Sequence, residues 1–364
     1  MRSERVHLGR PINRELVGAV LTRDLRVGGE PWSKGRVLSA EDLQRLEAEP
    51  TEARGMWAGE TAHHGARSAA GITLLIPEAG DVHEDAAAFG LAAAVAGAGV
   101  TVRGPSESRV DLLAAHDGVL RVDVARLERV NRLDPVSVFS AYDGQVVALG
   151  SVVASVKVGP HLVARSVLER ATVIARAHRG PVIDVHPFVR RRVAALVRET
   201  LGDAARARFE ASVRTRVEHL GSQLTEIAYT GDDTDAVAVE LERLSRGPAA
   251  AAILLTAGAG STDPEDPLFV ALDRLGGRVV SHGVPAHPGS MLWLGRLRRT
   301  TIIGLPTCGA YSRATAVDLL LPWLLTGDPP TRSTVARLGH GGLLTRDMRF
   351  RMPRYTQGLD APEG

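Results

Sequence analysis

The chain has 364 residues, of which 44% are hydrophobic and 4% aromatic, and its formal net charge is +2. This length predicts two or more domains, with cores built mainly from Ala, Val and Leu. The small net charge gives no indication of a nucleic-acid partner, whereas an anionic small molecule is allowed. Cys308 is the single cysteine, which excludes an intrachain disulfide framework and a Cys-cluster zinc site. Because no long apolar run or signal-like segment is present, we expect a cytoplasmic protein with no membrane association.

The first segment predicts a strand at Leu16–Leu21, a turn at Gly28-Gly-Glu-Pro31 and a second strand at Lys34–Leu38. Ser39 stands three residues before Asp42 and ahead of an apolar stretch. This spacing is typical of a capping box, so a short helix is expected to begin there.

The middle of the chain predicts a β-rich domain. Asp117-Gly118 and Asp143-Gly144 are dipeptides favoured in tight turns, because glycine accepts positive φ at little cost. They separate short alternating segments, and one short helix at 124–131 interrupts the pattern. A strand is expected at 72–76 and a helix at 84–98. The strands expected after this helix are 109–113, 118–122, 136–139 and 145–149.

From about Pro181 strands alternate with longer helices, which predicts an α/β domain with a mostly parallel sheet in three layers. The expected strands are 193–197, 223–228 and 250–256, and the expected helices are 204–220 and 233–245. In such sheets ligands bind where the strands end at their carboxyl side. We therefore divide the chain into a strand and helix segment at 1–60, the β-rich domain at 61–180, the α/β domain at 181–330 and a tail at 331–364.

The loop after the strand 250–256 is the strongest candidate site. Thr256, Gly258, Gly260 and Ser261 would offer free N–H groups and hydroxyls before a helix that begins near Pro267, an arrangement suited to phosphate. Asp263 and Asp266 would serve as Mg²⁺ ligands or as acceptors for the nitrogen donors of a bound molecule. An ordinary strand-to-helix turn with an Asp N-cap explains the spacing equally well.

Three loops resemble those of molybdopterin adenylyltransferases, molybdotransferases and gephyrin. Thr256-Ala-Gly-Ala-Gly-Ser-Thr-Asp-Pro-Glu-Asp266 is similar to the family's Thr-Gly-Gly-x-Ser-x-x-x-x-Asp loop. His287-Pro-Gly-Ser290 resembles its Pro-Gly-Lys-Pro loop, and Ile303-Gly-Leu-Pro-Thr-Cys-Gly309 resembles its Gly-Leu-Pro-Gly-Asn-Pro loop. The order and separation of the three agree, and the resemblance spans residues 190–330.

The rest of the chain is similar to uncharacterised bacterial molybdopterin-binding proteins. Lys34-Gly-Arg-Val-Leu38 resembles the family's Lys-Gly loop, and Ala114-Ala-His-Asp-Gly118 resembles its Ala-x-x-Asp-Gly segment. Gly339-His-Gly-Gly342 resembles the family's ending, although the cysteine that usually follows is missing.

The resemblance implies that the α/β domain binds molybdopterin or the molybdenum cofactor during its maturation or its delivery to a molybdoenzyme. It places Thr256, Gly258, Gly260 and Ser261 at the phosphate. The resemblance assigns the remaining cofactor contacts to Asp263, Pro288, Gly289, Ser290, Pro306 and Thr307. The partner it implies is a pterin, with a molybdoenzyme as a further candidate, and family members assemble as homo-oligomers.

The strand 193–197 departs from the family, whose corresponding strand ends in Thr-Gly-Ser-Glu. Here it leads into Arg198-Glu-Thr200. If catalysis persists, it is nucleotidyl or molybdenum transfer to molybdopterin with Asp266 as the metal ligand. The alternative is a non-catalytic scaffold or storage protein that keeps the fold.

An arginine-rich helix at 204–220 contains Arg206, Arg208, Arg214 and Arg216. These side chains could steer an anion toward the site, but a solvated helix face is the favoured interpretation. Glu210 and Arg214 stand four residues apart and predict an ordinary surface pair.

Overall fold

A computed structural model describes residues 1–49, 71–106, 109–177, 180–258, 263–305, 314–328 and 331–358. The chain forms two compact units. Unit 1 comprises residues 1–114, 122–141 and 150–184, and unit 2 comprises residues 115–121, 142–149 and 185–364. In the described part of the chain, no helix has the length and apolarity that a membrane span requires. The four-segment division made from the sequence stays a prediction.

The first part of unit 1 is a small sheet packed on one helix. The elements are β1 (Arg2–His7), η1 (Arg14–Leu16), β2 (Val20–Leu21), β3 (Leu25–Val27), β4 (Glu30–Trp32), α1 (Ala40–Ala48) and β5 (Gly71–Ile76). The capping box at Ser39 and Asp42 is confirmed, because each side chain accepts the other's backbone N–H. Leu43, Leu46 and Trp32 are buried in the same apolar cluster, which fixes α1 against the strands.

The strands predicted for this first part were wrong in extent. A 3-10 turn occupies 14–16, so only Val20 and Leu21 of the first strand are extended in the sheet. The segment 34–38 contributes a single bridge between Val37 and Val20. A hairpin of β3 and β4 lies between them instead, because Gly28 and Gly29 both have the positive φ that a tight hairpin turn needs.

The second part of unit 1 is a four-stranded antiparallel sheet in the order β10-β12-β8-β7, on which α2 packs. The elements of this part are β6 (Asp81–His83), α2 (Glu84–Val95), β7 (Val100–Ser106), β8 (Arg109–Ala114), α3 (Val124–Asn131), β10 (Val136–Ser140), β12 (Val152–Val158), β13 (Leu162–Ala164) and α4 (Arg165–Arg176). The helix predicted at 124–131 is confirmed. The sequence does not reveal β12 or the 12-residue α4. This region therefore contains more helix than was predicted for a β-rich domain.

Three further strands, β9 (Gly118–Val122), β11 (Val146–Val147) and β14 (Ile183–Pro187), form a sheet in the order β11-β9-β14. Gly118 is required there, since an added Cβ would lie 2.1 Å from the His186 carbonyl oxygen.

Unit 2 is built on a six-stranded sheet, so the predicted mixed α/β class is confirmed. Its elements are β15 (Arg192–Val197), α5 (Asp203–Glu218), β16 (Gln223–Tyr229), α6 (Thr234–Ser245), β17 (Ile253–Ala257), α7 (Pro267–Arg274), β18 (Arg278–His282), β19 (Trp293–Leu297), β20 (Thr300–Leu305) and α8 (Val317–Leu324). The strand order is β16-β15-β17-β20-β19-β18. The pairs from β16 to β20 are parallel, whereas β19 is antiparallel to β20 and to β18.

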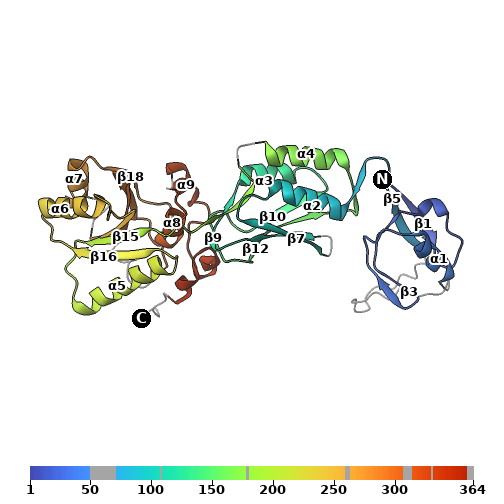
Figure 1. The fold of residues 1–364 in the computed structure, drawn as a ribbon, viewed down its shortest axis with the longest axis horizontal. Coiled ribbons are helices and arrows are strands. Elements are labelled where there is room, and N and C mark those ends of the chain that lie inside the picture. Colours follow the sequence, from blue (N-terminus) through green and yellow to red (C-terminus); the bar gives the residue numbers. More distant parts are fainter. Residues whose placement is uncertain are drawn as a thin grey trace. The chain divides into compact units, whose positions relative to one another are not determined.

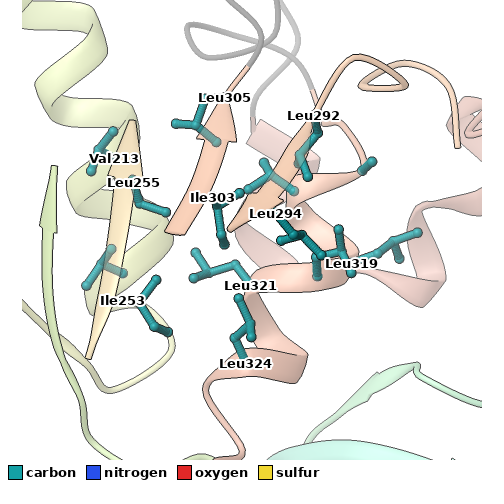
Figure 2. Packing of buried hydrophobic residues seen from close by; sticks show 14 of the residues in the cluster. Val213, Ile253, Leu255, Leu292, Leu294, Ile303, Leu305, Leu319, Leu321 and Leu324 are labelled. Carbon is teal, nitrogen blue, oxygen red and sulfur yellow. The ribbon is translucent and has the colours of Figure 1, made fainter. Parts of the chain in front are cut away.

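Helices cover both faces of this sheet (Figure 1). Alternate residues of a strand point to opposite faces, so Ala195 belongs to the cluster with α5 and α8, and Leu196 to the cluster with α6 and α7. Figure 2 shows Ile253, Leu255 and Ile303 on the same side of the sheet as Leu321 of α8. Both faces of the central strands are therefore removed from water.

The C-terminal segment packs onto unit 2 through α9 (Arg332–Arg337), η3 (Arg346–Arg351) and η4 (Arg354–Gly358). Met352 and Val335 are buried in the cluster of α5 and α8, and Tyr355 packs against it. The Tyr355 hydroxyl donates to Asp318 Oδ1 at 2.9 Å, and burial is the first cause that raises the Tyr355 pKa well above 10.

Candidate functional site

The strands that carry the three family-like loops have their loop-side ends at one edge of the sheet. β15, β17 and β20 are parallel neighbours, and their carboxyl ends are paired through Val197 with Ala257 and Ala257 with Leu305. β19 runs the opposite way, with Trp293 opposite Gly304, so the loop that precedes β19 reaches the same edge. The topology thus brings the segments after β15, β17 and β20 and before β19 together.

Gly258, which directly follows β17, packs against the residues that follow β15. Its φ is +92°, which favours glycine, and an added Cβ would lie 2.9 Å from the Glu199 Cγ and 3.1 Å from the Arg198 carbonyl carbon. Thr256 just before it is buried, and its hydroxyl lies 3.5 Å from the Ile303 carbonyl oxygen of the neighbouring strand. Thr256 therefore faces the sheet, and Gly258 is the first position of the loop at the edge.

Arg198 holds the loop together, and sequence reasoning missed its role. Its guanidinium donates to Asp266 Oδ2 at 2.5 Å, to Asp232 Oδ1 at 3.0 Å and to the Gly258 carbonyl oxygen. The side chain is only 8% exposed, and its Nε is buried with no hydrogen-bond partner among the described residues. The departure from the family's Thr-Gly-Ser-Glu strand end was the available signal for a cation at this place.

Asp266 and Asp263 lie in different environments. Asp266 is buried and caps α7, with Oδ1 accepting from Leu268 N–H at 2.9 Å and Oδ2 from Arg198. Asp263 is exposed, and its Oδ1 accepts from Glu265 N–H at 2.9 Å. Both oxygens of Asp266 are engaged by N–H donors and one is neutralised by a guanidinium. This donor set does not fit the magnesium site expected from the sequence, since Mg²⁺ needs available oxygen ligands in near-octahedral geometry.

Pro288 and Gly289 pack against the segment that follows the third loop. Ala316 N–H donates to the Pro288 carbonyl oxygen at 2.9 Å. Gly289 has a φ of +106°, and an added Cβ would lie 2.8 Å from the Ala316 nitrogen. Ser290 is exposed, and its carbonyl oxygen accepts from Val284 N–H at 3.0 Å. The second family-like loop is therefore in direct contact with the residues that lie just before α8.

The Gly-His-Gly-Gly ending also joins this edge. His287 N–H donates to the Gly342 carbonyl oxygen at 2.7 Å, and Leu344 N–H donates back to the His287 carbonyl oxygen at 2.8 Å. Gly342 has no room for a side chain, because a Cβ would lie 2.3 Å from the Pro285 carbonyl oxygen. His340 is exposed in the turn before it. The ending thus supports the second loop through backbone hydrogen bonds.

Comparison with solved structures finds molybdopterin biosynthesis proteins, the kind of protein that the sequence motifs resemble. MoaB from Thermus thermophilus is 17% identical, with a TM-score of 0.27 over 38% of this chain and 98% of that one. The MoeA protein from Pyrococcus horikosii is 13% identical, with a TM-score of 0.28 over 62% and 68%. A molybdopterin biosynthesis protein from Mycobacterium abscessus is 12% identical, with a TM-score of 0.25 over 32% and 80%. No family model and no curated protein matches the sequence.

The remaining predicted positions, Gly260, Ser261, Pro306, Thr307 and the cysteine Cys308, lie outside the described residues. Their roles stay predictions.

The arginines of α5 divide into two groups. Arg206 pairs with Glu210 and Arg214 with Glu218, each at 2.9 Å, so the Glu210–Arg214 pair expected from the sequence is replaced by its two neighbours. Tyr229 donates to Glu210 at 2.9 Å, and burial followed by this hydrogen bond raises the Tyr229 pKa to about 12. These groups belong to the solvated face that was expected.

Arg216 corrects that expectation. Its side chain is 2% exposed and its Nε lies 2.9 Å from Oδ1 of the fully buried Asp318. It faces inward because α5 packs on the sheet through this side and α8 supplies the counter-charge. Spacing along α5 alone could not separate Arg216 from its solvated neighbours.

Proposed function

We propose that unit 2 contains a three-layer molybdopterin-binding domain that holds molybdopterin or the molybdenum cofactor during its maturation or delivery. The observation that supports this most is that the strands carrying the three family-like loops bring their loop-side ends to one sheet edge. Glycine at positions 258 and 289 lets the backbone there pack closely against Arg198 and Ala316, and this packing fixes the edge over which a phosphate would lie.

In this proposal the phosphate of the pterin lies over the loop that follows β17, with Gly258, Gly260 and Ser261 as its contacts. The buried Nε–H of Arg198 would donate a hydrogen bond to this phosphate, since it has no hydrogen-bond partner in the described part of the chain. Asp263 is exposed and would accept from the donor nitrogens of the pterin, while Pro288, Gly289 and Ser290 would line the opposite wall.

We favour binding over adenylyl transfer, because Asp266 is held by Arg198 and the α7 N-terminus. Metal-assisted transfer needs a carboxylate that can take the metal. A non-catalytic scaffold or storage role remains the second candidate, and it differs in predicting no bound pterin. With Mg²⁺ and ATP we expect little adenylylated molybdopterin, and turnover matching a competent adenylyltransferase would contradict this.

The test is whether the purified chain retains a pterin that fluoresces after acid iodine oxidation. Gly258→Ala should abolish retention, because the added Cβ meets Glu199 and Arg198. Gly276→Ala is the matched control, since Gly276 also has positive φ (+73°) but has open space around it. Equal retention by both variants would show that this loop does not hold the pterin.

Ser261→Ala gives a finer test of the same loop. Loss of a hydrogen bond to a charged group costs roughly 1.5–3 kcal/mol, so pterin affinity should fall about tenfold to hundredfold. If Ser261 served only the helix start, the thermal midpoint would fall and affinity would stay the same.

A further inference from the structure

Unit 1 contains a cavity of about 550 Å³ that the proposed pterin site does not use. Its walls come from segments far apart in the sequence, and they include Asp24, Lys34, Glu84, Asp85 and Lys157. A volume of this size is typical of pockets for small molecules, roughly 300–1,000 Å³.

The two lysines are the feature that singles out this cavity. Of the 44 Lys and Arg residues in the sequence, only Lys34 and Lys157 are lysines, and both line it. Arg and Lys are interchangeable on most solvated surfaces, but not where a compact, rotatable ammonium is needed. In a chain that otherwise uses arginine throughout, two lysines far apart in sequence meet at one place.

Both lysine side chains are exposed, and in the part of the chain that the structure describes neither has a hydrogen bond or ion pair. The backbone N–H of Lys34 donates to Asp24 Oδ1 at 2.8 Å, which fixes the start of its loop. Lys157 stands on β12 between the buried Val156 and Val158, so the alternation of the strand directs it away from the core. Within the described residues, these two ammonium groups therefore have no carboxylate within ion-pair distance.

Buried contacts around Glu84 fix another part of the cavity wall. Glu84 is 3% exposed at the start of α2, and its Oε1 lies 2.7 Å from His161 Nδ1. His83 Nε2 lies 2.9 Å from the Gly35 carbonyl oxygen. Gly35 has a φ of +83°, and an added Cβ would lie 2.6 Å from Glu84 Oε1. The turn that contains Lys34 can therefore pack against Glu84 only with glycine at position 35. Glu84 is thus bound to His161. The ammonium groups of Lys34 and Lys157 can still contact a ligand.

We propose that this cavity binds a small phosphorylated molecule. Lys34 and Lys157 hold its doubly charged phosphate, and the carboxylates of Asp24 and Asp85 accept from N–H donors on the rest of the ligand. Two ammonium groups match the charge of one phosphate dianion, and the three carboxylates of the same lining, Asp24, Glu84 and Asp85, favour a ligand that also carries N–H donors. This site is separate from the pterin site of unit 2 and does not depend on it.

The first test follows the reactivity of the two ε-amines in the full chain. Acetylation of Lys34 and Lys157 is measured by mass spectrometry with GMP, guanosine or inorganic phosphate present, at constant ionic strength. GMP should slow acetylation of both lysines with one shared half-saturating concentration, phosphate should do so more weakly, and guanosine should have no effect. Protection of one lysine only, no protection by GMP and phosphate at millimolar concentration, or equal protection by sodium chloride would overturn the proposal.

The second test measures GMP binding by calorimetry in Lys34→Gln and Lys157→Gln. Each variant should bind at least about tenfold more weakly, as expected for loss of one charged hydrogen bond. Arg129→Gln is the matched control, because Arg129 is an exposed cation on α3 of the same unit and lies away from the cavity. An equal loss in the control would show general electrostatic attraction and would overturn the proposed site.

Discussion

The charged groups of the two units are arranged in opposite ways. At the sheet edge of unit 2, Arg198 is bonded to Asp266, Asp232 and Gly258, so its charge is compensated within the protein. In the cavity of unit 1, the exposed ammonium groups of Lys34 and Lys157 have no carboxylate within ion-pair distance among the described residues. A charge that is paired within the protein stabilises the fold, whereas an unpaired charge that lines a cavity can pair with a bound ligand. Substitution of Arg198 should therefore affect folding, whereas substitution of Lys34 or Lys157 should affect ligand binding.

The largest expected effect is that of Arg198→Met. It leaves the buried Asp266 carboxylate without its cation, which should cost roughly 3–5 kcal/mol of unfolding free energy in urea titrations. Arg274→Met on α7 is the control, because its pair with Asp235 is more than half exposed on both sides and should cost no more than about 1 kcal/mol. Similar small losses in both variants would mean that the charge of Asp266 is not compensated by Arg198 in the way described.

The next largest effect is expected for Tyr355→Phe, which removes the hydrogen bond between Tyr355 and Asp318 in unit 2. The lost hydrogen bond to the Asp318 carboxylate should cost about 1.5–3 kcal/mol at neutral pH. Because burial raises the Tyr355 pKa, its contribution is complete below the unfolded value of about 10 and is lost as pH rises toward the folded pKa. The gap between the two proteins should therefore narrow above pH 10. As a control at neutral pH, Tyr142→Phe, at a residue 53% exposed, should cost no more than about 0.5 kcal/mol.

Gly35→Ala tests the wall of the unit 1 cavity. Gly29→Ala is an unusually close control, since both glycines have a φ of +83° and only Gly35 has a neighbour in the way. Displacing Glu84 should cost about 1–3 kcal/mol beyond the strain shared with Gly29→Ala. Thermal and urea unfolding of the two variants would decide this, and equal stabilities would indicate that Glu84 moves freely.

The smallest effect on folding is expected for Lys34→Gln and Lys157→Gln. Both side chains are exposed, so the unfolding free energy should change by less than about 0.5 kcal/mol. A large loss of stability in either variant would place that lysine in the fold rather than at a ligand site.

Patterns along the chain determined a good part of this structure. The capping box at Ser39, the helix start after Asp266 and the buried strand at 253–257 follow from local rules, namely which side chains can cap an N-terminus and which alternation suits a covered sheet. The glycine-containing loops were also identifiable, because their residue types and order resemble a family.

The tertiary structure alone decided which charges meet. Arg198 reaches Asp266 across 68 positions, and Arg216 reaches Asp318 across 102. Lys34, in a turn after β4, and Lys157, on β12, line one cavity. Periodicity tells which side of an element is buried, but strand order and register determine what lies opposite that side. The first segment shows the same limit: the turn at Gly28 and Gly29 was predicted, but the strands that it joins are 25–27 and 30–32 and not the predicted 16–21 and 34–38.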